Sequence, residues 1–433
     1  MEKYDIFLFI YNNIKNYIFL KTLKQHIRLN KLQYKILKDY SHYSNNLYNY
    51  SLYVANQHFK QTGKYIGIKN LEDIVKLNDN YKLLPIQTAQ QTIRLLDQNY
   101  RAFFSLLRKK SKGEYDDKIQ IPKYKKKGNC FNVIFTNQNS KLKNNKLTFY
   151  KGRDYKILNN NKLEIDFTYK IDGKIKQIMF QPKYNGKYFI MYVNYEENKK
   201  QQLNLNKSNY LSIDLGINNF CACIDTLGHS FLMNGKPLKS YNRWYNKQVA
   251  EVKSELKLKN NKNWSNYLQK ITMDRENWID NYFNQIVSKL TNHCIKNDMG
   301  NVVIGYNEGW KNECNMGKIN NQKFYSIPHL KFKLKLENKC NEIGINFIYH
   351  EESYTSKCSL IDLEPIKKQE FYLGKRVKRG LFQTDKGIKL NADINGSGNI
   401  LRKVIGDAWL SQPIVDLMLN PVKINFYKKI SIL

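Results

Sequence analysis

Acidic residues are scarce in this sequence. Of its 433 residues, 72 are Lys or Arg and 37 are Asp or Glu, so the formal net charge is +35. A globular protein does not need such an excess for solubility, and a polyanionic partner would relieve the self-repulsion that it causes. Lys, Asn, Ile and Tyr are all abundant, as in proteins encoded by AT-rich genomes. A bias in base composition explains Lys and Asn together but does not explain the shortage of acids. The charge balance therefore predicts nucleic-acid binding.

Paired cysteines and long apolar runs are also missing. The seven cysteines are scattered, at positions 130, 221, 223, 294, 314, 340 and 358, which favours a reducing compartment. No segment approaches the roughly 18 apolar residues of a membrane helix. The apolar stretch 5–11 is short and is followed by Asn12, Asn13, Lys15 and Asn16, so we expect neither a signal peptide nor a membrane span. The expected location is the cytoplasm, in association with the nucleoid.

The first half of the chain combines helical and strand patterns. With 42% hydrophobic residues the chain can fold, and its length allows two or three domains. Residues 30–62 and 85–109 have apolar side chains at helical spacing. From about 131 to 197 the period changes to two, with Asp172-Gly173 and Asn185-Gly186 as hairpin signals. We expect a small antiparallel β barrel or bent sheet with a helical insertion at about 30–110.

Basic residues cluster in three places that can meet phosphate groups. The loop 122–128 interleaves Tyr124 with Lys123, Lys125 and Lys126 between a Pro and a Gly, although such a loop can also simply be solvated. Arg243 stands at the start of a basic helical hairpin predicted at about 240–297. A third group lies in the segment 359–389 and includes Arg376 and Arg379.

Two aspartates in the second half each end an apolar run and are followed by Gly and Asn. Asp214 lies in the segment 210–218 and Asp393 in the segment 390–400. The predicted order is three antiparallel strands at 210–214, 221–224 and 230–233, the helical hairpin, a strand at 301–305, a helix at 328–343, a strand at 344–349, and Asp393 at a helix start. This is a ribonuclease-H-like mixed α/β arrangement. Two carboxylates brought together by such a fold can hold divalent cations and cut a phosphodiester.

Four motifs of the second half together resemble the TnpB (OrfB) proteins of small bacterial insertion sequences, which are compact relatives of single-effector CRISPR nucleases. They are the segments 212–218, 304–311, 352–358 and 391–400, and in the first half Gln87–Leu107 and Pro122–Lys127 also look like the family's helix and basic loop. The resemblance runs from about residue 20 to about 405.

The resemblance implies a fold and a function. The implied domains are an N-terminal extension (1–20), a β-barrel wedge domain (21–200) with the helical recognition segment, and a RuvC-like nuclease domain (201–433). The implied activity is Mg²⁺-dependent cleavage of double-stranded DNA, guided by an RNA from the element's end, next to a short flanking motif. A separate transposase or recombinase of the element is a possible further partner. The alternatives are a nuclease-dead, RNA-guided repressor and a transposase that acts directly in DNA recombination.

The chain departs from the family at the zinc site. Family members usually carry two Cys-x-x-Cys pairs between the Thr-Ser-Lys motif and the last acid, but residues 354–400 hold only Cys358 and no histidine. Four zinc ligands cannot be assembled from this segment. We therefore expect no zinc, and a metal-free basic flap at 359–389.

The second departure is the middle acid of the nuclease site. Relatives usually have a Glu where this chain has Gly305, and some are known for a relocated Glu. Three acids could replace it: Glu352, Glu308 and Glu351, of which Glu352 is favoured because it follows the next strand of the sheet. The expected site is Asp214, Glu352 and Asp393 holding two Mg²⁺ ions, with Glu308 as the alternative third acid and an inactive site as the remaining possibility.

Overall fold

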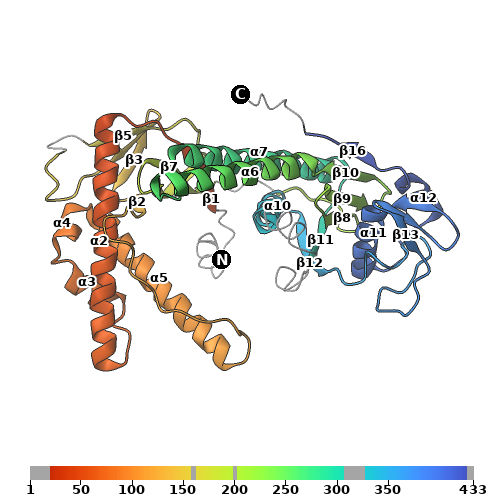
Figure 1. The fold of residues 1–433 in the computed structure, drawn as a ribbon, viewed down its shortest axis with the longest axis horizontal. Coiled ribbons are helices and arrows are strands. Elements are labelled where there is room, and N and C mark those ends of the chain that lie inside the picture. The colour runs from red at the N-terminus through yellow and green to blue at the C-terminus, as the bar shows by residue number, and fades with distance from the viewer. Residues whose placement is uncertain (1–19, 158–161, 198–201, 307–326, 427–433) are drawn as a thin grey trace. The chain divides into compact units, whose positions relative to one another are not determined.

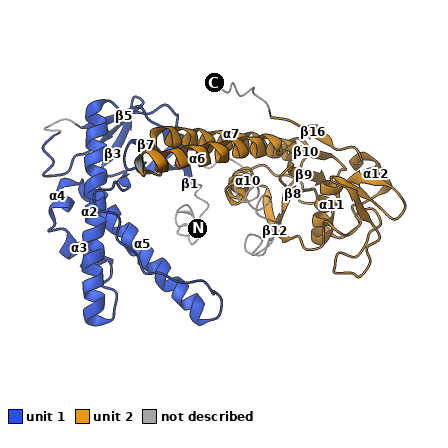
Figure 2. Ribbon diagram, viewed as in Figure 1, with its two compact units in different colours: residues 1–200 blue, residues 201–433 orange. Residues whose placement is uncertain are grey.

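The chain folds into two compact units, residues 1–200 and 201–433 (Figure 2). The structure, a computed structural model, describes residues 20–157, 162–197, 202–306 and 327–426 (Figure 1). Among these, no helix is long and apolar enough to cross a membrane.

Four helices follow the first strand of unit 1: α2 (Lys31–Thr62), α3 (Ile68–Val75), α4 (Asp79–Leu83) and α5 (Ile86–Ser111). Helix α2 begins at a capping box formed by Asn30 and Gln33 and ends at Gly63, whose φ of 67° suits glycine. The long helices predicted at 30–62 and 85–109 are confirmed. The apolar face of α5 is buried only as far as Tyr100, and Leu107 remains exposed.

The strands of unit 1 form two antiparallel sheets. One has the order β1-β7-β6-β2 and the other β3-β4-β5, with bounds β1 Leu20–His26, β2 Val133–Thr136, β3 Ser140–Lys143, β4 Lys146–Phe149, β5 Leu163–Asp166, β6 Gly173–Lys183 and β7 Tyr188–Glu197. The antiparallel pairing that we expected for a barrel or bent sheet is present, and the described strands are hydrogen-bonded as two separate sheets. The side chain of Asn139 accepts from the Thr136 amide (2.7 Å), and this turn separates β2 from β3.

One of the two predicted hairpin turns of unit 1 is correct. Asn185-Gly186 joins β6 to β7, with φ values of 56° and 76°. Asp172-Gly173 joins no hairpin, because β5 pairs with β4 while β6 pairs with β7 and β2.

Unit 2 is built on a six-stranded mixed sheet in the order β12-β11-β8-β9-β10-β16. Its strands are β8 Tyr210–Leu215, β9 Asn219–Asp225, β10 Ser230–Asn234, β11 Asn301–Tyr306, β12 Asn346–Glu351 and β16 Val422–Ile424. Strands β8, β9 and β10 are antiparallel neighbours, and β11 and β12 run parallel to β8. The mixed α/β sheet and the strand order expected from the sequence are confirmed.

Helices cover both faces of this sheet: α6 Lys236–Asn260, α7 Asn266–Lys296, α10 His329–Ile343, α11 Ala392–Ile405 and α12 Gln412–Met418. Side chains alternate along β9, so that Cys221 and Cys223 join a core with residues of α7 and α10, whereas Ala222 and Ile224 join a second core with α11. Helices α6 and α7 lie side by side as the predicted hairpin (Figure 1), linked by Tyr245 and Thr272 (2.9 Å).

The segment predicted as a basic flap contains a small antiparallel sheet of its own. Its strands are β13 Lys375–Lys378, β14 Leu381–Gln383 and β15 Lys389–Asn391. Strand β15 leads directly into α11, so this sheet is attached to the helix that carries Asp393.

Candidate active site

Asp214 lies near the end of β8, where the strand passes close to α11. The hydroxyl of Ser212 donates to the Ser397 carbonyl (2.7 Å), and that of Ser397 donates to the Ser212 carbonyl (3.1 Å). A Cβ at Gly396 would lie 2.9 Å from Asp214 Oδ2, so the missing side chain at this position allows the close approach. Gly396 and Ser397 of the 391–400 motif therefore allow α11 to pack closely against β8.

The Asp214 carboxyl is surrounded by protein and by other acids. Its burial, followed by the negative charges of Glu352 and Asp393, raises the pKa of Asp214 to about 8, while Arg376 acts in the opposite direction. A buried carboxyl whose neighbours are carboxylates is the kind of group that a divalent cation stabilises in its charged form. The chemistry of these side chains therefore fits a magnesium site.

Asp393 stands in the first turn of α11. Asn391 caps this helix by accepting from the Asp393 amide (2.9 Å) and the Ile394 amide (3.3 Å). Asn219 donates to Asp393 Oδ2 (2.8 Å), and Arg376 lies 3.7 Å from Oδ1. Asn219 thus fixes one oxygen of Asp393, and the flap supplies a cation beside the other.

Glu352, one residue beyond β12, occupies the space that a side chain at position 305 would fill. A Cβ on Gly305 would lie 2.1 Å from Glu352 Oε2. Burial raises the pKa of Glu352, and the nearby Lys333 lowers it. The structure therefore brings Glu352 to the group formed by Asp214 and Asp393.

The other two candidates for the third acid were Glu351 and Glu308. Glu351 is exposed and pairs with Lys403 (2.8 Å), and its other oxygen accepts from the Ser353 amide (2.6 Å). It is therefore held in a surface ion pair, apart from the group around Asp214. Glu308 lies outside the described residues.

Lys333 is a site residue that the sequence analysis missed. Its ammonium donates to the Gly305 carbonyl (2.8 Å), and only 7% of the residue is exposed. Burial lowers the pKa of Lys333, and the charges of Glu352 and Asp214 raise it. The available signal was a lysine on the buried face of α10, in line with Phe332, Leu336 and Cys340. Asn219 was also missed, and no sequence signal marked it.

The ligand atoms of the three acids are not all within 4.8 Å of one another. Among the described residues, the only three His, Cys, Asp or Glu side chains with ligand atoms all within 4.8 Å of one another are Asp225, His229 and His293.

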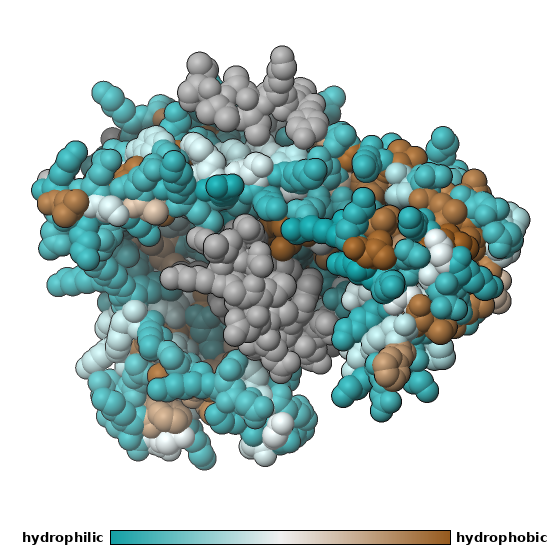
Figure 3. Space-filling model, turned by 45° about the vertical axis from the view of Figure 1, so that its right-hand side comes forward, coloured by the Kyte–Doolittle hydropathy of each residue, from teal (hydrophilic) through white to brown (hydrophobic). Residues whose placement is uncertain are grey.

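The basic residues predicted to contact nucleic acid are placed in different ways. Lys123, Tyr124 and Lys126 are exposed, as are Arg243 and Arg379. Lys125 instead lies over the rings of Tyr48 (4.3 Å) and Phe131 (4.0 Å), and its backbone pairs with Asn49, so it helps to hold the loop. Hydrophilic residues cover most of the face drawn in Figure 3, as expected for a chain with this many lysines.

Comparisons with known proteins match the chain to one group. Residues 192–311 match the family model OrfB_IS605, described as a probable transposase, and residues 329–400 match the Cas12f1-like TNB domain. The TnpB-like protein ORF457 of Acidianus two-tailed virus is 26% identical over 87% of this chain and 85% of its own.

A solved structure supports the fold. The protein in a cryo-EM structure of a Cas12f1–sgRNA–target DNA complex aligns with 88% of this chain and 98% of its own, with a TM-score of 0.55 and 13% identity. With two family models matched in order along the second half, and a TnpB-like relative matched over most of both chains, the comparisons support the similarity to the TnpB (OrfB) proteins that the motifs indicated.

Proposed function

We propose that this protein is an RNA-guided, Mg²⁺-dependent DNA endonuclease of an insertion sequence, with unit 2 as a RuvC-like, ribonuclease-H-like nuclease domain. The observation that carries the proposal is the meeting of Asp214, Glu352 and Asp393, which come from β8, the end of β12 and the start of α11. The match to the OrfB_IS605 family model and the fold shared with a protein solved in complex with guide RNA and target DNA support the choice of substrate.

The three acids are the proposed ligands of two Mg²⁺ ions. Asp214, whose carboxyl is influenced by the charges of Glu352 and Asp393, would hold the ions together with these two residues. When bound, the ions would supply an activated water and stabilise the leaving oxygen of the phosphodiester. Asn219 holds Asp393 in place, and Lys333 offsets the negative charge of Glu352 and Asp214.

Basic residues of the chain are proposed to position the nucleic acids. Arg376 lies beside Asp393 on the small sheet of the flap, where a guanidinium can meet a phosphate of the strand to be cut. Lys123, Tyr124, Lys126, Arg243 and Arg379 offer exposed contacts to the backbone of guide or target. Pairing between guide and target would then supply the sequence specificity.

Cleavage by the protein with its own guide tests this function. The protein is expressed together with the DNA that flanks its gene, the co-purified RNA is sequenced, and DNA matched to that RNA is offered with Mg²⁺ or with chelator. We expect cleavage of matched DNA only, and only with Mg²⁺. Binding of matched DNA without cleavage would instead support the nuclease-dead repressor.

RNA binding is expected to depend steeply on salt. Each phosphate that a Lys or Arg neutralises releases counterions, so raising salt from about 50 to 200 mM should weaken binding on the order of a thousandfold if six or more phosphates are contacted. This expectation rests on the net charge of +35. Filter binding or fluorescence anisotropy across this range measures the slope, and a flat response would contradict the phosphate contacts.

The affinity of the RNA-free protein for Mg²⁺ is expected to rise with pH. The pKa of Asp214 is about 8 without metal, so below that pH a cation must displace its proton. Affinity should therefore fall by up to about tenfold for each pH unit below about 8 and level off above it. Calorimetric titration of Mg²⁺ at several pH values measures this. Asp214→Asn removes a proposed ligand and should abolish this binding, and binding with an unchanged slope in that variant would assign the slope to another group.

A further inference from the structure

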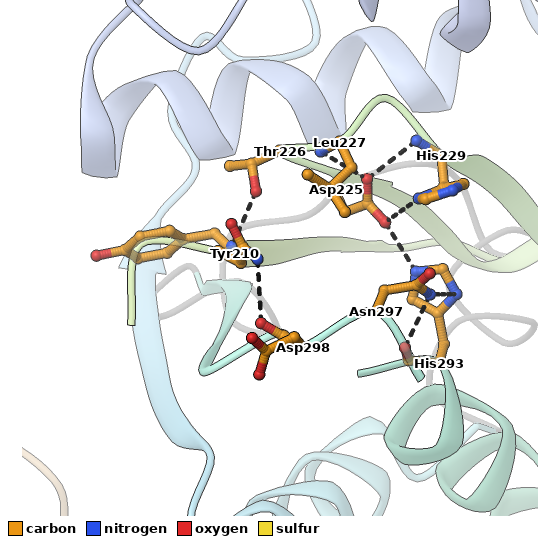
Figure 4. Close-up of polar contacts among 9 residues, drawn as sticks. Tyr210, Asp225, Thr226, Leu227, His229, His293, Asn297 and Asp298 are labelled. Atoms are coloured by element: carbon orange, nitrogen blue, oxygen red, sulfur yellow. Dashed lines mark hydrogen bonds and ion pairs between the residues drawn. The ribbon is translucent and has the colours of Figure 1, made fainter. Parts of the chain in front are cut away.

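An aspartate and two histidines meet at the opposite end of the central sheet from the three acids. Asp225 is the last residue of β9 and pairs with Leu211, whereas Asp214 pairs with Ala222 further along. His229 follows in the turn between β9 and β10, and His293 comes from the last turns of α7 (Figure 4). The proposed nuclease chemistry uses none of these three side chains.

The Asp225 carboxylate is fully buried and each of its oxygens has its own partners. Oδ1 accepts from the backbone amides of Leu227 and His229, both at 2.9 Å, which fixes the carboxylate in the turn. Oδ2 lies 2.9 Å from His229 Nδ1 and 2.8 Å from His293 Nε2 (Figure 4). Two imidazole nitrogens thus converge on a single carboxylate oxygen.

We propose that Asp225, His229 and His293 bind a divalent transition-metal ion, and that this ion is Zn²⁺. Zinc takes His nitrogen and Asp oxygen at about 2.0–2.2 Å, so ligand atoms around a tetrahedral ion lie roughly 3.3 Å apart. The three ligand atoms here all lie within 4.8 Å of one another. The two imidazole nitrogens would each move away from the Asp225 oxygen by about half an ångström, from hydrogen-bond distance to the roughly 3.3 Å between ligands of one ion.

The fourth position of the ion would be open to water. Half of the His229 side chain is exposed, so solvent reaches this side of the cluster. Cys294 follows His293 in the chain, but it is buried in the core of unit 2 and does not belong to the cluster. The protein ligands are therefore one Asp and two His, with a water as the fourth.

Asn297 supports the orientation of His293. Its amide contacts His293 Nδ1 (3.2 Å) and the His293 carbonyl (2.9 Å). These contacts hold the ring of His293 with Nε2 toward Asp225.

A bound ion would tie the β9–β10 turn to α7. Asp225 and His229 are four residues apart in the turn, and His293 is remote in sequence, so the ion would join two elements that enclose one core of unit 2. The expectation that the chain lacks zinc considered only the segment 354–400, and this cluster lies outside it. The ion is thus proposed as structural, separate from the acids.

Zinc binding by the full chain tests the proposal. Protein stripped with a chelator is titrated with Zn²⁺ by calorimetry in excess Mg²⁺, which occupies the carboxylate site. We expect one site per chain, an intense visible spectrum when Co²⁺ replaces Zn²⁺, and a thermal midpoint raised on the order of 5 °C at a hundredfold excess over Kd.

Two ligand variants and two controls decide the location of the ion. His229→Gln, at a half-exposed position, and Asp225→Asn should each weaken Zn²⁺ binding on the order of a hundredfold or more. His58→Gln, in α2, and Asp214→Asn should bind like the unchanged chain. If Asp225→Asn does not fold, His229→Gln decides alone.

Two results would overturn the proposal. One is the absence of Zn²⁺ binding at micromolar concentration, which would leave the hydrogen bonds between the two imidazoles and Asp225 as the complete account of the cluster. The other is binding that His229→Gln leaves unchanged, because the ion would then lie elsewhere.

Discussion

Glu352→Gln is expected to abolish guided DNA cleavage while RNA and DNA binding stay intact. The substitution keeps the shape of the side chain but removes the charge that would hold a Mg²⁺ ion beside Asp214. Under single-turnover conditions with Mg²⁺, the rate should fall about a thousandfold or more, as for loss of one member of a catalytic unit. Asp214→Asn and Asp393→Asn should have losses of similar size. Because the three acids act together, the double variants should be no worse than the single ones.

The neighbouring Glu351 provides a matched control. It undergoes the same chemical change in Glu351→Gln, but it is exposed and paired with Lys403, so cleavage should stay within a few-fold of the unchanged protein. Cleavage that survives Glu352→Gln but is lost in Glu308→Ala would move the third acid to Glu308. Intact guided binding without any cleavage by the unchanged protein would support the repressor.

The fold was predictable where local patterns carry the information. Apolar residues at helical spacing located α2 and α5, and the runs that end at Asp214 and near Glu352 located β8 and β12. Strand ends in one sheet share an edge, which is why acids far apart in sequence could be expected to meet. Gly305 pointed to a relocated acid, and the structure adds the reason, because the Glu352 carboxylate fills the space above this glycine.

Contacts that depend on tertiary packing were not predictable. In the sequence Lys125 looks like one more basic loop residue, yet its ammonium lies over the ring of Tyr48, which is distant in sequence, and over that of Phe131. Lys333 sits on a buried helix face, and its partners come from another strand and its neighbouring loop. His293 looks isolated in the sequence because its partner, Asp225, is 68 residues away.

The division of the unit 1 strands into two sheets also depends on contacts that the sequence does not show. Hydrophobic alternation identifies strands but does not say with which partner each strand pairs. In unit 1 the turn held by Asn139 directs β3 away from β6 and toward β4. The side-chain amide of Asn139 also donates to Thr88 Oγ1 in α5 (3.1 Å). No local sequence pattern predicts this contact.

Gly305 permits a test of where the third carboxylate must be. Position 305 pairs with His350 in the parallel β11–β12 ladder, and Glu352 folds back over it. A Cβ there would lie 2.1 Å from Glu352 Oε2 and 3.0 Å from Ile400 Cδ1. Both contacts are with the ends of flexible side chains, so the chain can relieve them by moving those ends and not the backbone.

Gly305→Ala is therefore expected to impair cleavage far more than stability. The added methyl group displaces the Glu352 carboxylate, and a misplacement of about 1 Å in a catalytic group can cost about a hundredfold in rate. The thermal midpoint should change by only a few degrees, since no backbone atom is contacted. Single-turnover cleavage and thermal melting of the same samples measure the two effects.

The exchange variant, Gly305→Glu with Glu352→Ala, supplies a carboxylate from β11 and should cleave faster than Glu352→Ala alone. Full activity in Gly305→Ala would show that the Glu352 carboxylate is not needed where the structure places it, whereas equal loss of stability and cleavage would show that the glycine serves folding only.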